Sequence, residues 1–458
     1  MSVCIFLFHR DFRLYDNTAL IEVVKRGCKI LPVFIFTPSQ ATSQNPFLST
    51  NSVQFMIESL EDLANQIRLQ GGHLYTFMGN TITVLQNLVK QVNATFIAFN
   101  SDITPFAKMR DKEIQDAFKN KGIITISSDD YYLLPSSTVL KPDGTPYHKF
   151  TPYYEAHKKH VVKPPQSCPH ISFIKPAGLS STFKLSDAYI QLGSLNALAA
   201  THGGRTNALL RIRDNAPFTK YSSRRNLLAE NTSMLSAFIK FGCVSIREVY
   251  KAYIHNKEFI RQLVWRDFYA SLLHHHPEMV NPNIRTLNVR WNTSDSLFNA
   301  WALGRTGYPV VDACMRQLNT TGYMHNRGRL IVASFLVKTL LIDWRKGERY
   351  FAQKLLDYDV ASNNGNWRWI SGEGVATSDG HVAHFDSQPY FRIFNPWNQT
   401  ETCDPDTVFI KQWIPELANI DKKRILHWYE EKTPVNGYPL PIVDFAIEKK
   451  KVLNAYSK

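Results

Sequence analysis

Tryptophan is the residue type of this 458-residue chain whose placement most suggests chemistry. All nine tryptophans lie in the C-terminal half, and the first of them, Trp265, is spaced i+3 and i−4 from Gln262 and Tyr269. On a helix this spacing presents all three side chains on one face. Indole can stack on a flat ligand, and it is oxidised more easily than any aromatic side chain except tyrosinate. For any single tryptophan of a helical domain, however, core packing is the more ordinary role.

Three other patterns could bind ligands. The stretch TSMLS at 232–236 precedes a helical segment, so it could bind phosphate at a helix N-terminus or be an ordinary helix cap. HHHP at 274–277, and His381, His384 and Asp386, could suggest a metal. Consecutive helical residues point in different directions, and the second group lies in a surface loop, so we expect no metal site. The six cysteines are far apart and contain no CxxC pair, which argues against a disulfide framework or a local zinc site.

The charge balance favours a polyanionic partner. Lys and Arg number 53 against 39 Asp and Glu, a formal charge of +14. Nucleic acid is the first candidate, and scattered solubilising lysines are the alternative. No run approaches the roughly 18 apolar residues that span a bilayer, and the N-terminus lacks a secretory pattern. We expect an intracellular protein that does not bind membranes, and the sequence does not distinguish cytoplasm from nucleus.

These side chains need a scaffold, and the hydrophobic patterns predict one of mixed class, α/β plus all-α. Continuous apolar runs alternate with helical patterns over the first ~125 residues, as in a doubly wound parallel sheet. The first strand–helix turn, HRDFRLYDN, has no glycine, so a GxGxxG dinucleotide loop is absent. The predicted strands are 3–8, 29–36, 73–79, 94–100 and 122–128, and the predicted helices are 17–25, 52–69, 81–92 and 105–121.

Beyond the sheet, the strand pattern disappears. Residues rich in Pro, Ser, Tyr and Lys predict a long connector with a few short helical turns, and helical spacing dominates from there to the end of the chain. The predicted domains are therefore 1–130 (α/β), 131–200 (connector) and 201–458 (helical).

Several long motifs occur together in one order. GRTGYPVVDACMRQLNTTGYMHNRGRLIVASFLVK at 304–338 and LLIDWRKGERYFAQKLLDYDVASNNGNWRW at 340–369 are the longest, and PYFRIFNPWNQ at 389–399, TSMLSAFIKFG at 232–242 and FLFHRDFRLYDNTAL at 6–20 accompany them. The chain resembles the photolyase/cryptochrome flavoprotein family over nearly its whole length. Within it, the chain is most similar to class I cyclobutane pyrimidine dimer photolyases.

The resemblance implies a carbon–carbon lyase that repairs DNA with light. Its cofactor would be FAD, its partner damaged DNA with pyrimidine dimers, and the reaction an electron transfer from photoexcited reduced FAD that splits the dimer. We expect a monomer. A second antenna chromophore in the N-terminal domain is implied without its identity, and Ala107 stands where folate-binding photolyases tend to have Glu.

By resemblance, specific residues take specific roles. FAD would contact Tyr221, Thr232, Ser233, Met234, Leu235, Ser236, Arg329, Asp357, Tyr358, Asp359 and Asn363. The flipped-out lesion would meet Gln262, Asn326 and two aromatic walls, Trp265 and Trp369, and electrons would reach the flavin through Trp301, Trp344 and Trp367. DNA phosphates would meet Arg225, Arg266, Arg327, Arg392 and Gln399, although a structural ion pair is as plausible for any single arginine.

Departures from the family pattern keep alternatives open. Gln262 replaces the usual Glu, as in (6-4) photolyases, but Asn326 and Leu330 stand where those enzymes have histidines. Asn363 occupies a position where plant-type cryptochromes have Asp, which favours repair over blue-light signalling. Residues 371–388 form an unusually long segment after Trp369, which we expect to be a mobile loop at the pocket entrance.

Overall fold

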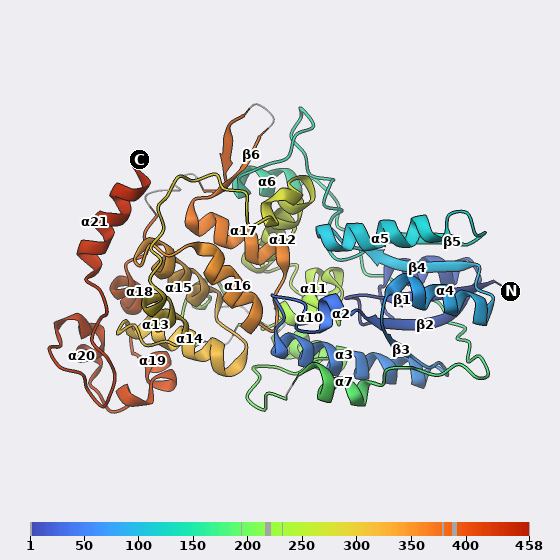
Figure 1. Cartoon of the computed structure of the whole chain (residues 1–458), viewed down its shortest axis with the longest axis horizontal. Helices are drawn as coiled ribbons and strands as arrows, with labels where there is room; N and C mark the ends of the chain where they lie inside the picture. The colour runs from blue at the N-terminus through green and yellow to red at the C-terminus, as the bar shows by residue number, and fades with distance from the viewer. Residues whose placement is uncertain are drawn as a thin grey trace.

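The computed structural model describes residues 2–193, 195–215, 221–230, 232–377, 380–386 and 392–457. An α/β half and a larger helical half lie side by side, with the N-terminus and C-terminus at opposite ends of the molecule (Figure 1). No helix within the described residues is long and apolar enough to cross a membrane. Both halves follow the predicted fold class.

The predicted parallel sheet is confirmed. Its strand order is β3-β2-β1-β4-β5, and every neighbouring pair is parallel. The two continuous apolar runs nearest the N-terminus become strands over their predicted lengths, whereas the other three begin two residues later. The bounds are β1 Val3–Phe8, β2 Lys29–Phe36, β3 Tyr75–Met78, β4 Phe96–Ser101 and β5 Ile124–Asp129.

Helices cover both faces of the sheet. Alternate residues of β1 point to opposite faces, so Phe6 packs with α1 and α3 whereas Leu7 packs with α4 and α5. Sequence-encoded caps start the helices: the side chains of Asn17 and Asn80, for example, accept hydrogen bonds from the first turns of α1 and α4. The bounds are α1 Thr18–Lys25, α2 Pro38–Ala41, α3 Thr50–Leu69, α4 Thr81–Val92 and α5 Pro105–Phe118.

The connector is more ordered than its composition predicts. It forms two helices of eight residues each, α6 Phe150–His157 and α7 Leu185–Leu192. α7 packs on α3 and α6 packs on α12, while Phe173 forms a bridge to Ile30 beside the sheet. Because one apolar core includes residues of the sheet, the connector and the first helices of the helical half, residues 131–200 are part of the packed structure.

The helical half contains a second core around Trp301, Trp344 and Trp428. The sequence predicts no strands here, which is wrong for one hairpin of two three-residue strands, too short to give a periodic signal. Its elements are α8 Arg205–Asn215, α9 Tyr221–Arg224, α10 Ser236–Lys240, α11 Ile246–Ala252, α12 Lys257–His275, α13 Asp295–Ala302, α14 Pro309–Thr321, α15 Asn326–Lys338, α16 Trp344–Lys354, α17 Val360–Ser371, β6 Gly374–Ala376, β7 Val382–His384, α18 Pro396–Cys403, α19 Val408–Trp413, α20 Lys422–Leu426 and α21 Phe445–Tyr456, with 3-10 turns at Pro277–Val280, Pro415–Leu417 and Trp428–Glu430.

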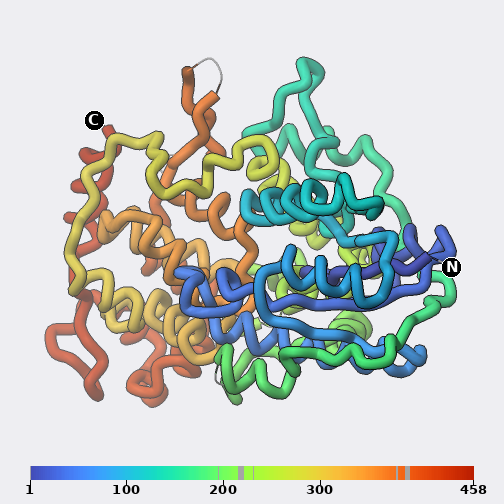
Figure 2. Tube along the Cα trace, turned by 45° about the vertical axis from the view of Figure 1, so that its right-hand side comes forward, coloured from blue at the N-terminus to red at the C-terminus, as the bar shows by residue number. Residues whose placement is uncertain are grey.

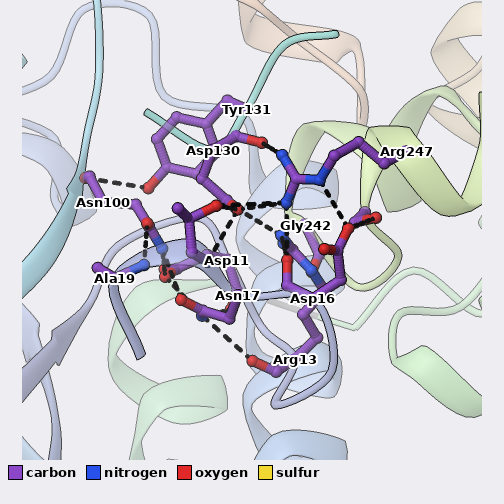
Figure 3. Close-up of polar contacts among 12 residues, drawn as sticks. Asp11, Arg13, Asp16, Asn17, Ala19, Asn100, Asp130, Tyr131, Gly242 and Arg247 are labelled. Carbon is purple, nitrogen blue, oxygen red and sulfur yellow. Dashed lines mark hydrogen bonds and ion pairs between the residues drawn. The ribbon is translucent and has the colours of Figure 1, made fainter. Parts of the chain in front are cut away.

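The glycine-free turn after β1 joins the two halves. Arg13 pairs with Asp130 at 2.5 Å, and Arg247 of α11 pairs with Asp130 and Asp16, each at 2.8 Å (Figure 3). All four side chains are buried. Gly242 lies against this turn with φ near +60°, and a Cβ there would come within 2.4 Å of a carbonyl oxygen of the turn. The turn therefore binds the helical half, at the place where other doubly wound folds bind a dinucleotide.

Candidate active site

One cavity of about 560 Å³ in the helical half collects most of the residues that the sequence motifs pick out. It lies among α9, α10, α12, α15 and α17. The predicted site residues that line it are Tyr221, Arg225, Thr232, Ser233, Met234, Leu235, Ser236, Gln262, Trp265, Arg266, Asn326, Arg327, Arg329, Asp357, Tyr358, Asp359, Asn363, Trp367 and Trp369. Trp301, Trp344, Arg392 and Gln399 do not line it.

An ion pair between a partly buried arginine and a buried aspartate marks one wall of the cavity. Arg329 on α15 donates to Asp357 at 2.8 Å and to the carbonyl of Met324 at 2.9 Å. The second carboxylate oxygen of Asp357 is buried and accepts no hydrogen bond from the described residues. A buried acceptor of this kind needs a partner, and the N–H or O–H groups of a nucleotide cofactor would supply one.

The segment 232–236 also lines the cavity. The hydroxyl groups of Thr232 and Tyr323 lie 3.2 Å apart, and Met234 has a left-handed φ of 50°. The segment leads into α10, a helix of five residues. Its first-turn N–H groups have no intrahelical acceptors, so both sequence interpretations, a cap and an anion contact, use the same backbone groups.

The N-terminal end of α17 faces the same cavity. Asn363 donates its amide N–H to the carbonyl of Glu348 at 3.2 Å, which leaves the amide oxygen as an acceptor. Asp359 caps α17 through the N–H of Ser362 and also pairs with Arg10 of the α/β half at 3.3 Å. Burial alone would raise the pKa of Asp359, but Arg10 and neighbouring cations outweigh it and lower that pKa. Asp359 is therefore an ionised residue.

The aromatic wall on α12 is backed by the connector. The ring of Phe150 stacks on Trp265 with centroids 3.6 Å apart and planes 6° from parallel. One face of the indole is therefore covered, and a ligand can reach only its other face or its edge. Gln262 and Tyr269 line the cavity beside Trp265, as the i, i+3, i+7 spacing predicts, and the Gln262 amide donates to the Glu258 carbonyl at 3.3 Å.

The second aromatic wall, Trp369, is also partly covered. The guanidinium of Arg392 lies 5.0 Å from its ring centroid, and Arg392 pairs with Asp386 at 2.6 Å. Asn326 is exposed where α15 begins, at the mouth of the cavity. The segment after Trp369 is a β6–β7 hairpin rather than an irregular loop; Ser378, Asp379 and 387–391 lie outside the described residues.

The three tryptophans predicted to carry electrons are all buried. Trp367 lines the cavity. The ring centroids of Trp301 and Trp367 are 6.4 Å apart, and the two ring planes make an angle of 73°. Exposure is 2% for Trp367, 1% for Trp344 and 0% for Trp301, whose indole N–H donates to the Val332 carbonyl at 2.9 Å. Trp301 therefore has the environment of a core residue, and this trio offers no exposed indole to a donor in solution.

The sequence reasoning missed Trp291. The next residue, Asn292, forms a bridge with Ile342, two residues before Trp344. The indole of Trp291 is only partly buried. Trp291 thus lies between the surface and the buried tryptophans. No local pattern around position 291 indicates this, because the contact joins segments about 50 residues apart.

Three of the five predicted phosphate contacts, Arg225, Arg266 and Arg327, line the cavity, whereas Arg392 and Gln399 do not. Arg225 and Arg327 lie at the cavity, where they pair with Glu258 at 3.3 Å and Asn226 at 2.8 Å. Arg266 donates to the Tyr131 carbonyl and stacks over Tyr132, so it holds the connector. Arg392 is paired with Asp386, and Gln399 lies on α18 and accepts a weak hydrogen bond from Cys403.

The comparisons with known proteins agree with this geometry. The family model "DNA photolyase" matches residues 4–170, and "FAD binding domain of DNA photolyase" matches residues 259–458. The chain is 34% identical to a deoxyribodipyrimidine photo-lyase of Alkalihalophilus pseudofirmus, over 98% of this chain and 96% of the relative.

Solved structures extend the likeness to both branches of the family. An archaeal photolyase from Sulfolobus tokodaii with two FAD molecules is 36% identical, with a TM-score of 0.87 over the whole of both chains. A cryptochrome from Synechocystis is 26% identical, with a TM-score of 0.87 over 99% of each chain. The subclass is not established by these comparisons, so class I stays a prediction. The chain belongs to the photolyase/cryptochrome family.

Proposed function

We propose that this protein is a photolyase that binds pyrimidine dimers in DNA and splits them in blue light with reduced FAD. The observation that carries the proposal is that one cavity presents two kinds of wall. Ionic and amide groups, Arg329, Asp357 and Asn363, line it together with the stacking and amide groups of Trp265, Trp369 and Gln262. A flavin and an extruded pyrimidine dimer can then lie within a single space.

The cavity residues fit FAD. The orphaned oxygen of Asp357 and the amide oxygen of Asn363 would accept hydrogen bonds, and the backbone at 232–236 would take the phosphates. When bound and reduced, FAD supplies the photoexcited electron that opens the cyclobutane ring. The protein positions the two partners and excludes water between them.

Lesion binding rests on stacking and neutral hydrogen bonds. The part of the Trp265 indole that lines the cavity can stack on a flipped-out base, which is worth about 1–3 kcal/mol, and Phe150 stacks on one face of the indole. Gln262 can donate one N–H and accept one, which matches a thymine edge without adding a charge. Arg225 and Arg327, which line the cavity, would contact flanking phosphates, and Arg392 would do so only if its pairing with Asp386 opened.

Electrons would reach the flavin through Trp367 and Trp344. We place Trp291, rather than the fully buried Trp301, at the outer end of the path, because an external donor must contact an accessible indole. The relative with two FAD molecules supports a second chromophore here as well, and its identity is open.

The test is blue-light repair of a defined oligonucleotide containing one cyclobutane dimer, with chemically reduced holoprotein and a dark control. A (6-4) oligonucleotide is assayed beside it, because Gln262 is the feature shared with (6-4) photolyases. Repair of the cyclobutane dimer alone supports the proposal. Repair of neither, in a protein whose flavin still photoreduces, would favour the cryptochrome function instead.

A further inference from the structure

Two histidines that are 128 residues apart in the chain face each other outside the cavity. The Nε2 atoms of His148, in the connector just before α6, and His276, at the C-terminal end of α12, lie 2.9 Å apart. Their ring centroids are 5.0 Å apart. The connector loop that contains His148 projects from the same edge of the molecule as the β6–β7 hairpin (Figure 2). Neither histidine belongs to the motifs that identify the family.

Glu278 orients one of the two rings. Its carboxylate lies 3.2 Å from Nδ1 of His276, which is close enough to accept that N–H. The proton then resides on Nδ1, and Nε2 of His276 presents a lone pair toward His148. A carboxylate on the remote nitrogen is the usual outer partner of a metal-bound histidine.

Both rings are suited to be neutral ligands. An imidazole binds a metal ion as the neutral ring, and Nε2 of His148 becomes a ligand atom when the proton that it donates to His276 in the 2.9 Å contact moves to Nδ1. The side chain of His276 is only 13% exposed. Imidazole nitrogen is a preferred ligand of Zn²⁺, Cu²⁺ and Ni²⁺.

We propose that His148 and His276 bind a divalent transition metal ion such as Zn²⁺, with water in the remaining positions. Two nitrogens on a tetrahedral zinc lie about 3.3 Å apart, so the rings need to separate by only a few tenths of an ångström. No third His, Cys, Asp or Glu of the described chain completes a larger ligand group, which explains why the sequence tract at 274–277 does not predict the site.

The ion would fasten the connector to the lesion wall. His148 is two residues before Phe150, whose ring stacks on Trp265, and His276 ends the helix that carries Trp265. Bound metal would thus link the two segments that support this indole.

Calorimetric titration of ZnSO₄ into metal-stripped, FAD-containing protein tests the site. The wild type should bind one ion per chain, and His148→Ala and His276→Ala should abolish that binding. Glu278→Gln should weaken it by about 10-fold, as losses of outer-shell partners do. His274→Ala is the matched control, because it removes a histidine of the same tract whose ring lies against His275 instead; it should bind as the wild type does.

Absence of a saturable site in the wild type would overturn the proposal, and so would undiminished binding by His148→Ala. Equal loss in His274→Ala would also overturn it, since the ion would then bind the consecutive histidines at 274–276. An unchanged flavin spectrum verifies folding of each variant. If His148→Ala fails to fold, His148→Gln takes its place, and Zn²⁺ should raise the thermal unfolding temperature of the wild type but not of that variant.

Discussion

Replacing Asp130 by asparagine should lower the free energy of unfolding by about 3–5 kcal/mol, the usual cost of breaking a buried ion pair. Asp130 is 3% exposed and accepts from Arg13 at 2.5 Å, from Arg247 at 2.8 Å and from the Thr18 hydroxyl at 2.7 Å (Figure 3). Asparagine keeps the shape but removes the charge, and it turns an NH₂ group toward a donor. The buried guanidinium groups of Arg13 and Arg247 then lose the carboxylate charge of Asp130 that offsets the cost of burying them.

The same substitution should change the pH dependence of stability. Burial alone would raise the pKa of Asp130, but Arg13 and Arg247 outweigh it and lower the pKa to about 2, from 3.8. A depressed acid pKa gives stability that is complete above about pH 4 and is lost as pH falls toward 2. The shift corresponds to about 2–3 kcal/mol. The gap in unfolding free energy between wild type and Asp130→Asn should therefore narrow by about 2 kcal/mol between pH 5 and pH 2.

Urea unfolding, followed by tryptophan fluorescence at several pH values, measures both effects. Glu230→Gln is the control, because Glu230 pairs with Arg224 on the surface at 3.4 Å and should contribute no more than about 1 kcal/mol. A loss for Asp130→Asn no larger than that of the control would refute the reasoning. A gap that is constant across the acid range would refute the linkage argument.

Three further predictions concern the cavity. Trp291→Phe should slow the photoreduction of oxidised FAD by an external donor, whereas Trp301→Phe should not. Both variants should still repair dimers after chemical reduction. Equal photoreduction rates for Trp291→Phe and wild type would reject this electron path. Gln262→Leu should weaken dimer binding by about 1–3 kcal/mol in a titration with lesion DNA, since lesion carbonyls lose a donor; full affinity would show that the amide makes no contact. Arg327→Ala should lower the slope of log K against log salt by about one unit on damaged and undamaged duplex alike, and a loss of lesion discrimination alone would count against a phosphate contact.

Much of the fold follows from local patterns in the sequence. The continuous apolar runs at β1 and β2 predict buried parallel strands, and capping residues such as Asn17 and Asn80 predict where helices begin. The i, i+3, i+7 spacing places Gln262 and Tyr269 beside Trp265 at one cavity. These features depend on contacts within one helix or one strand, so the spacing of apolar and polar residues along the sequence predicts them.

The features that local patterns do not predict are contacts between distant segments. Phe150 covers one face of Trp265 from 115 residues away in sequence, and Asn292, next to Trp291, bridges to Ile342, two residues before Trp344. The β6–β7 hairpin is likewise defined by its pairing. The family resemblance provided site positions but not the surroundings of Trp301, because a motif specifies residue types and not their burial.

The helix α17 shows how these distant contacts act on the site, because remote parts of the chain hold both of its ends. Helix α17 contains Asn363, Trp367 and Trp369. At its N-terminal end the cap Asp359 pairs with Arg10 of the glycine-free turn in the α/β half. At its C-terminal end the carbonyl of Ser371 accepts the hydroxyl of Tyr456, on the last helix of the chain, at 2.9 Å. Segments near both ends of the sequence thus contact the helix that contributes amide, electron-path and stacking residues, although none of the described residues of the α/β half lines the cavity itself.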